Sequence, residues 1–261
     1  MTSALWIAKT GLDAQQMRMA VITNNLANVS TTGFKRGRAQ FEDLMYQNVR
    51  QTGGQTSQNT TLPSGLSLGT GVRNVSTAKV FTQGNIVQTG NNLDLAINGR
   101  GFFQILMPDG TTAYSRDGAF QTNSTGEVVT SNGYPLQPAI TIPANTQSVT
   151  VGRDGSVSAQ IAGQTAAQTI GTIQIADFIN PTGLQPIGQN LFMESTASGS
   201  PQPGNPDASG LGSLMQSALE TSNVNVVQEM VDMIETQRAY EMNSKAIATT
   251  DQMLQYINNN L

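Results

Sequence analysis

The sequence predicts an α+β fold, with N- and C-terminal α-helices that form a coiled-coil-like inner layer and an all-β domain inserted between them. Apolar residues repeat every seven positions at both ends of the chain, which is typical of helices that pack against other helices. The middle instead holds short β-branched runs separated by Gly, Asn and Asp. We expect a discontinuous helical rod-like core of residues 1–45 plus 216–261, an extended Gln/Thr/Gly-rich segment at 46–65, and a β-rich outer domain at 66–215.

Composition excludes several classes of function. The 261 residues include no cysteine and no histidine, which rules out disulfides, thiolate zinc sites and a Ser-His-Asp triad. The formal net charge of -4 argues against attraction to nucleic acid or to an anionic membrane. The N-terminus lacks a basic region and a long apolar run, and no window approaches the ~20 apolar residues of a membrane span. We therefore expect a soluble chain that, if it leaves the cytoplasm, does so without a cleaved signal peptide.

The first helix is expected to begin near Thr2 or Ser3 and to end in an Asn-rich stretch before Gly33. Its apolar stripe requires a partner helix, because it follows the a and d positions of a heptad. The two columns of the stripe are Leu5, Leu12, Met19 and Leu26, with Ala8, Gln15, Ile22 and Val29 three places on.

The Asn-rich stretch has the sequence NNLANVSTTGFKRGR and spans residues 24–38. We expect its asparagines to bond backbone groups where the helix ends, and Gly33 to permit a reversal of the chain. Phe34 is expected to pack against a neighbouring helix. The basic residues that follow form a short cluster in an acidic chain, so we expect them to be solvated.

The C-terminal helix carries a longer repeat. Its apolar column is Leu219, Val226, Met233, Tyr240, Ile247, Leu254 and Leu261, and the flanking column is mixed, with an apolar Met230 followed by polar residues. Ser222 or Asn223 is expected to cap the helix. A helix over 223–257 would be about 50 Å long at 1.5 Å per residue, which a compact domain of this size cannot cover. Outward stripes such as Val227 and Ile234 are therefore expected to pack against other subunits.

The middle of the chain is punctuated by turn signals. Segment 46–65 has no usable period, and its composition alone indicates a flexible linker. Asp-Gly occurs between strand-like runs at 108–110, 116–118 and 153–155, and each occurrence predicts a hairpin turn. A loop at 194–212 is expected to lead back to the C-terminal helix.

The residues predict no catalytic, cofactor-binding or metal site. Gly-x-Gly at 99–101 lacks the third glycine and the helix of a phosphate loop, so a turn into a strand is favoured. Asp94, Asp117 and Asp154 are the candidates for paired carboxylates, but two of them lie in Asp-Gly turns, where aspartate bonds backbone amides. Subunit packing is the role that we expect instead. It is assigned to Leu5, Leu12, Met19, Ile22, Leu26, Val226, Met230, Met233, Tyr240, Ile247 and Leu254.

Both ends of the chain resemble the bacterial flagellar rod and hook family. Residues 24–35 match its N-terminal pattern Asn-Asn-x-Ala-Asn-x-x-Thr-x-Gly-Phe-Lys, and residues 222–254 resemble its C-terminal signature. INGRGFFQI, at 97–105, is similar to a strand of the family's β domain. Within the family the chain is similar to the distal rod members nearly throughout. The signature residues are Asn24, Asn25, Ala27, Asn28, Gly33, Phe34, Lys35, Gln237, Arg238, Ala239, Tyr240, Asn243, Ser244 and Lys245.

The resemblance implies a noncatalytic structural subunit of the distal rod, a helical polymer that acts as the rigid drive shaft between motor and hook. It implies a homo-oligomer that contacts proximal rod proteins, the hook protein and the surrounding basal-body rings. It also implies passage through the flagellar type III export apparatus to a rod that crosses the periplasm, with no cofactor, no nucleic acid and no membrane insertion. Segment 46–63 corresponds to an insertion associated with straightness of the distal rod, and we expect neighbouring subunits to order it.

Two alternatives stay open from the sequence. A proximal rod or hook subunit of the same family should not need segment 46–63. A secreted β-rich adhesin or polysaccharide-active protein would instead be monomeric, with a ligand cleft and dispensable termini. Circular dichroism of the monomer separates the classes, because a rod subunit should show strong β signal and less helix than its sequence allows.

Overall fold

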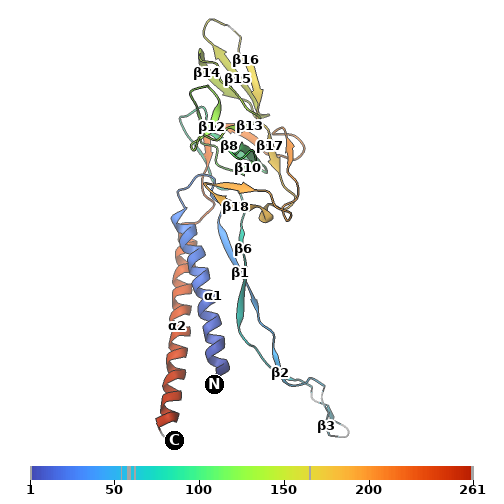
Figure 1. The fold of residues 1–261 in the computed structure, drawn as a ribbon, viewed down its shortest axis with the longest axis vertical. Coiled ribbons are helices and arrows are strands. Elements are labelled where there is room, and N and C mark those ends of the chain that lie inside the picture. Colours follow the sequence, from blue (N-terminus) through green and yellow to red (C-terminus); the bar gives the residue numbers. More distant parts are fainter. Residues whose placement is uncertain (1, 54, 58–59, 62, 165, 260–261) are drawn as a thin grey trace. The chain divides into compact units, whose positions relative to one another are not determined.

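The computed structural model describes residues 2–53, 55–57, 60–61, 63–164 and 166–259. The chain divides into two compact units (Figure 1). Unit 1 contains Met1–Leu26, Gly37–Ala78 and Asn225–Leu261, and unit 2 contains Ala27–Arg36 and Lys79–Val224. Helices lie at both ends of the chain and strands fill the middle, which confirms the predicted α+β class with an inserted β region.

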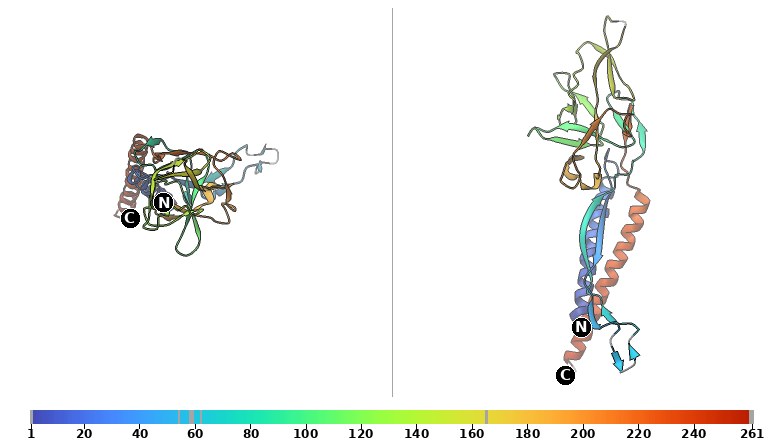
Figure 2. Two further views of the ribbon diagram at one scale, coloured as in Figure 1. Left: turned by 90° about the horizontal axis from the view of Figure 1, so that it is seen from above. Right: turned by 90° about the vertical axis from the view of Figure 1, so that its right-hand side faces the viewer.

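Two long helices form the greater part of unit 1. Helix α1 (Thr2–Ala27) and helix α2 (Val226–Asn259) run antiparallel and lie side by side in both views (Figures 1 and 2). They approach closely at Gly11, where an added Cβ atom would lie 3.1 Å from Asn243 Nδ2. Position 261 of the predicted heptad column lies outside the described residues.

The cap of α2 differs from the sequence prediction. Asn225 Oδ1 accepts hydrogen bonds from the backbone N–H groups of Val227 and Gln228, at 3.1 and 3.3 Å. The predicted caps, Ser222 and Asn223, precede the helix. Asn223 instead uses its Oδ1 atom to accept a hydrogen bond from the Arg36 backbone N–H at 2.7 Å. The prediction of the N-cap is therefore wrong by two or three residues, because this asparagine has a more distant partner.

A β ribbon completes unit 1. Strand β1 (Gly37–Asp43) pairs with β6 (Val72–Lys79), and Thr10 Oγ1 of α1 accepts a hydrogen bond from the Val72 backbone N–H at 3.3 Å. The shorter strands are β2 (Gln47–Arg50) paired with β5 (Leu66–Leu68), and β3 (Gln55–Ser57) paired with β4 (Thr60–Thr61). Strands therefore pair where composition alone indicates a flexible linker. Residues 54, 58–59 and 62 of that segment lie outside the described residues.

Unit 2 is built on a seven-stranded sheet of order β18-β19-β10-β9-β17-β20, with β13 also paired to β9. Its strands are β9 (Phe102–Leu106), β10 (Thr112–Ser115), β13 (Leu136–Gln137), β17 (Ile175–Asp177), β18 (Gln185–Gly188), β19 (Leu191–Met193) and β20 (Gln202–Gly204).

Smaller antiparallel sheets surround this one. The pairs are β7 (Ile86–Gln88) with β22 (Ala218–Glu220), β8 (Leu95–Asn98) with β21 (Ser213–Gln216), and β11 (Phe120–Thr122) with β12 (Val128–Thr130). A three-stranded sheet contains β14 (Thr146–Val151), β15 (Ser156–Ile161) and β16 (Gln168–Thr172), and a short 3-10 helix spans Pro181–Gly183.

Unit 2 encloses its own hydrophobic core. Phe103 is fully buried, and its ring meets that of Phe120 edge to face with 5.1 Å between centroids. A second cluster brings Phe102 against Phe178, with centroids 5.9 Å apart. Such aromatic pairs add about 0.5–1.5 kcal/mol to the stabilisation from buried area. The core thus gives unit 2 a closed interior within one chain.

Two of the three Asp-Gly predictions are confirmed. Gly110 joins β9 to β10 with a φ of +82°, and Gly155 joins β14 to β15 with a φ of +84°. The prediction of a hairpin at 116–118 is wrong, because β10 pairs with β9 and β19 whereas β11 pairs with β12. Gly118 lies so close to the Leu95 carbonyl that a Cβ atom there would overlap it.

Candidate functional site

The predicted packing residues of the two helices differ in exposure. Ile22 is buried, whereas Val226, Met230 and Tyr240 are 39%, 51% and 41% exposed. The others are partly buried: Leu5, Leu12, Met19, Leu26, Met233, Ile247 and Leu254. Some of the predicted packing residues are therefore not covered by the chain's own helices. Their role in contacts between subunits stays a prediction.

Helix α2 has two unlike faces. One column of buried or partly buried residues contains Glu229, Thr236 and Asn243 at steps of seven, and α1 lies against it at Asn25 and Gly11. At 100° per residue, the opposite side of α2 begins at Val227. That side carries exposed apolar residues near the start of α2, which we call the outer stripe: Val227 (72% exposed), Val231 and Ile234. Farther along, Met242, Met253 and Tyr256 are also exposed, but charged residues such as Arg238, Glu241 and Lys245 occupy the side opposite α1. The face toward α1 is thus partly polar, while large apolar side chains lie in solvent.

Helix α1 also leaves large side chains uncovered. Trp6 is 56% exposed and Met17 is 40% exposed. Exposed single apolar residues are ordinary on protein surfaces, but several that gather on one face of a helix are typical of interaction surfaces.

One signature asparagine connects three elements of unit 1. Asn25, at the end of α1, is 2% exposed. Its Nδ2 atom donates to the Gly37 carbonyl at 2.9 Å and to Glu229 Oε2 at 3.1 Å, and its Oδ1 atom accepts from the Gly37 N–H at 2.8 Å. Glu229 is also 2% exposed and lies in the first turn of α2. The carboxamide therefore fastens the end of α1 to the start of β1 and the start of α2.

The rest of the N-terminal signature is bound within unit 2. Thr32 Oγ1 donates to Asp117 Oδ1 at 3.0 Å, and the Gly33 N–H donates to the Glu220 carbonyl at 2.8 Å. Gly33 has a φ of +67°, and a Cβ atom there would lie 2.6 Å from the Asp117 backbone nitrogen. Glycine is thus required both by the backbone conformation and by the close approach.

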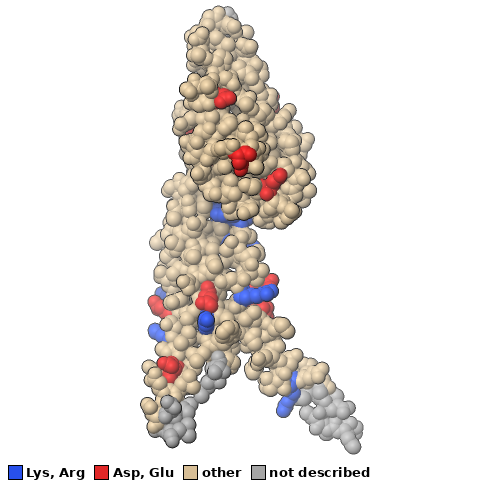
Figure 3. Space-filling model, in the orientation of Figure 1, with Lys and Arg blue, Asp and Glu red and all other residues tan. Residues whose placement is uncertain are grey.

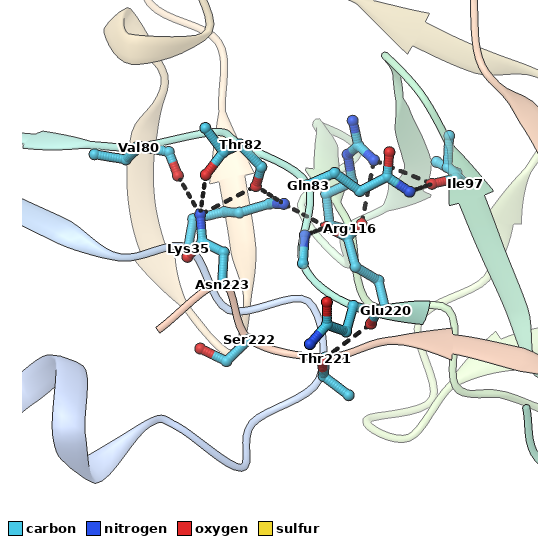
Figure 4. Close-up of polar contacts among 12 residues, drawn as sticks. Lys35, Val80, Thr82, Gln83, Ile97, Arg116, Glu220, Thr221, Ser222 and Asn223 are labelled. Carbon is cyan, nitrogen blue, oxygen red and sulfur yellow. Dashed lines mark hydrogen bonds and ion pairs between the residues drawn. The ribbon is translucent and has the colours of Figure 1, made fainter. Parts of the chain in front are cut away.

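Three buried charged residues meet beside this segment (Figure 4). Lys35 Nζ lies 2.5 Å from Glu220 Oε1, and Arg116 Nη1 lies 3.2 Å from Glu220 Oε2. Lys35 and Glu220 are each 1% exposed and Arg116 is 6% exposed. The Gly84 N–H donates a hydrogen bond to Glu220 Oε1 at 2.8 Å. Lys35 Nζ donates to the Thr82 carbonyl at 2.9 Å. We call Lys35, Glu220 and Arg116 the ion-pair centre.

A backbone carbonyl and an aromatic ring also contact the arginine of the centre. Arg116 Nη2 donates to the Gly99 carbonyl at 2.7 Å, and its guanidinium lies 5.3 Å from the centroid of the Phe102 ring. Burial lowers the pKa of Lys35 below its ordinary value, and the Glu220 carboxylate opposes part of that shift. Burial likewise lowers the pKa of Arg116. Buried charges tolerate this environment only when paired, so each member of the centre depends on the others.

Sequence reasoning missed this centre. The expectation of a solvated basic cluster is wrong for Lys35, which is buried and bonded. Arg116 and Glu220 are absent from the predicted site residues. The sequence feature that draws attention to Arg116 is the Arg-Asp-Gly that it shares with residues 153–155. In the structure the two copies differ, because Arg153 is exposed in a hairpin and Arg116 is buried.

The remaining signature residues have simple surroundings. Phe34 lies beneath Lys79, whose Nζ atom is 4.3 Å from the ring centroid. Asn28 and Ala239 are partly buried, as is Asn243, while the exposed members are Asn24, Ala27, Gln237, Arg238, Tyr240, Ser244 and Lys245. Packing of Phe34 on a helix of another subunit stays a prediction.

The described residues offer little for other chemistry. They contain no group of three metal-binding side chains, and neither described helix is long and apolar enough to cross a membrane. On the face drawn in Figure 3, uncharged residues cover most of the described surface.

Comparisons with known proteins agree with these features. Family profiles described as flagella basal body rod protein, flagellar hook protein FlgE/F/G D1 domain and flagellar basal body rod FlgEFG protein C-terminal match residues 5–35, 96–159 and 215–260. The flagellar basal-body rod protein FlgG of Buchnera aphidicola subsp. Schizaphis graminum is 58% identical over 98% of both chains. Its namesakes in Agrobacterium fabrum and Bacillus subtilis are 48% and 38% identical over 99% of both chains. The chain belongs to the flagellar basal-body rod protein family.

Proposed function

We propose that the chain is a noncatalytic subunit of the distal rod of the bacterial flagellum, and that its copies polymerise helically through α1 and α2. The observation that carries this proposal is the outer stripe of α2, opposite the face that meets α1. Burying one such large apolar side chain against a neighbour contributes about 1.5–3 kcal/mol. Several per subunit, repeated along a polymer, favour a stiff assembly.

The packing role of the partly buried residues belongs to the same proposal. Leu5, Leu12, Met19 and Leu26 on α1 join Met233, Ile247 and Leu254 on α2 in supporting the helix pair. Ile247→Asp is expected to abolish assembly, because a buried charge without a partner costs several kcal/mol. Rods of normal length in that variant would contradict the proposal.

The specific test targets the outer stripe. We expect Ile234→Asp to prevent polymerisation while the monomer keeps its free energy of unfolding, because Ile234 is 49% exposed in the single chain. Sedimentation and electron microscopy of purified protein measure polymerisation, and urea unfolding measures monomer stability. The matched control is Ile179→Asp, an exposed isoleucine in a loop of unit 2, which should leave polymers intact. Polymers in Ile234→Asp would contradict the proposal.

The β ribbon distinguishes the distal rod from its siblings. Met45, Tyr46, Val49, Leu66 and Leu68 are all more than half exposed on this ribbon. We propose that neighbouring subunits cover these side chains and that the ribbon thereby stiffens the rod. Deleting 46–63 should make rods bendable or misassembled. A proximal rod or hook subunit should tolerate the deletion, so unaltered straight rods would favour that alternative.

Partners and location follow from the same proposal. A rod subunit of this kind would contact proximal rod proteins, the hook protein and the basal-body rings, and would reach the periplasm through the flagellar type III export apparatus. The support is the family assignment of near full-length relatives named as basal-body rod proteins.

A further inference from the structure

We propose that the hydrogen bond between Asn25 and Glu229 is a register pin, which fixes how far α1 is displaced along α2. The inference rests on the proposed assembly function, because a polymer built from the helix pair needs one register in every copy. The pin lies wholly within unit 1, where α1 ends and α2 begins.

The apolar pattern by itself does not define one register. Leu5, Leu12, Met19 and Leu26 repeat every seven residues on α1, as do Met233, Tyr240, Ile247 and Leu254 on α2. A slip by one heptad therefore superposes the same kinds of side chain. The polar column of α2 does little to prevent this, because Thr236, Asn243 and Thr250 are similar in size and polarity.

Slipped registers are also electrostatically plausible. In the observed register, Gly11 lies against Asn243, and Asn25 lies against Glu229, so the two numbers of each pair sum to 254. In the observed register Arg18 Nη2 lies 3.9 Å from Asp232 Oδ1, and a slip that reduces the sum by seven brings Arg18 opposite Glu229, so one carboxylate would replace another. A slip in the other direction brings Gly11 opposite Thr250. Both slips separate Asn25 from Glu229.

The pin opposes these slips because its groups are buried and directional. Asn25 and Glu229 are each 2% exposed, so a lost contact between them is not simply replaced by water. The same carboxamide makes two further hydrogen bonds to Gly37, twelve residues along the chain. Those bonds tie the end of α1 to the start of β1, so α1 can slide along α2 only if these bonds break or β1 moves with it. A single buried asparagine is known to set register in coiled coils in this way.

The absence of cysteine permits a direct measurement of register in the full-length chain. Three double-cysteine proteins carry Gly11→Cys together with Asn243→Cys, Thr236→Cys or Thr250→Cys. The first reports the observed register, and the other two report slips of one heptad in either direction. Oxidation followed by electrophoresis gives the ratio of native to slipped cross-links, with and without polymerisation.

We expect the native pair alone to cross-link efficiently in the otherwise unaltered chain. Asn25→Leu, which keeps a similar volume, should lower the native-to-slipped ratio at least about tenfold, because a hydrogen bond to a charged group contributes that much or more. Glu229→Gln keeps an acceptor oxygen and should preserve the native pattern. The matched control is Gln16→Leu, an exposed amide on α1 away from Gly11, which should leave the ratio unchanged.

An unchanged ratio in Asn25→Leu would overturn the register pin, as would an equal change in Gln16→Leu. These outcomes are separable from failure of the assembly proposal. If Asn25→Leu lowers the native-to-slipped ratio but the unaltered chain never polymerises, the pin stands and the assembly proposal fails. If Asn25→Leu polymerises normally with an unaltered cross-link pattern, the pin fails and the assembly proposal stands.

Discussion

Unit 2 and the helix pair of unit 1 use apolar residues in opposite ways. Unit 2 encloses Phe103, Ile105 and Leu136 completely, and its exposed large apolar residues are few among those described. The helices of unit 1 expose Trp6, Val227 and Met242 by more than half. Unit 2 is thus completed by its own chain, whereas the helix pair, on our proposal, is completed by other copies.

The largest effect is expected where charges are buried in unit 2. Glu220→Gln leaves Lys35 and Arg116 buried without their carboxylate and should lower the free energy of unfolding by about 3–5 kcal/mol. Urea unfolding followed by circular dichroism measures the loss. Arg153→Leu is the matched control, since Arg153 is the exposed arginine of the other Arg-Asp-Gly, and it should change stability by less than about 0.5 kcal/mol. A loss in Glu220→Gln as small as the one expected for Arg153→Leu would show that the carboxylate of the centre is not stabilising.

Truncation of a large apolar side chain should affect stability in unit 2 much more than on the helices of unit 1. Phe103→Ala should destabilise unit 2 by about 3–5 kcal/mol, because it leaves a cavity in a packed core. Val227→Ala should change monomer stability by no more than about 0.5 kcal/mol, because its side chain already lies in solvent. Urea unfolding of the monomers gives both values. A large loss in Val227→Ala would mean that the outer stripe is covered within one chain.

Substitution of glycine by alanine measures how tightly each unit is packed around that glycine. A Cβ atom at Gly84 in unit 2 would overlap the Thr221 carbonyl oxygen, so Gly84→Ala should cost about 1–3 kcal/mol. Gly11→Ala in α1 meets only the end of the Asn243 side chain, which can shift, and alanine favours helix by up to about 1 kcal/mol. We expect no loss of helix content in Gly11→Ala by circular dichroism. If Gly11→Ala lowers the free energy of unfolding as much as Gly84→Ala does, then α1 and α2 pack as tightly at Gly11 as unit 2 packs at Gly84.

The smallest effect is expected in alkaline solution. Burial lowers the folded-state pKa of Lys35 below the ordinary 10.5. At a pH between the folded-state pKa and the ordinary pKa of the unfolded chain, the unfolded chain binds a proton at Lys35 that the folded chain does not. The free energy of unfolding therefore gains a contribution that rises with pH. Lys35→Met should remove that rise in urea unfolding measured at a series of pH values. Identical pH slopes in the two proteins would contradict the assignment.

Sequence patterns predicted the parts of this molecule that depend on near neighbours in the chain. The seven-residue repeats predicted both terminal helices, and Asp-Gly predicted the turns at Gly110 and Gly155. The third Asp-Gly failed because Arg116 bonds Glu220, 104 residues away, and that contact overrides the local turn preference. Lys35 was misjudged for the same reason, since its carboxylate partner lies 185 residues along the chain.

The sequence also did not reveal which side of α2 faces α1. Apolar periodicity identifies the Val226 and Met233 column, but the contact face also includes Glu229 and Asn243, which periodicity counts as solvent-facing. A polar residue is buried when a specific partner satisfies it, and that partner, Asn25, lies 204 residues away. Periodicity alone carries no information about such pairs.

The hydrogen bond from the Gly33 N–H to the Glu220 carbonyl has a consequence for the tolerance of insertions. The chain crosses between the units four times, and hydrogen bonds within unit 2 join the crossing segments to one another. The Val80 N–H donates to the Arg36 carbonyl at 2.8 Å, and the Arg36 N–H donates to Asn223 Oδ1 at 2.7 Å. An insert with neighbouring ends can be enlarged, shortened or exchanged without lengthening the path of the chain that carries it. Residues added within unit 2 therefore need not alter the path of the helices that carry it.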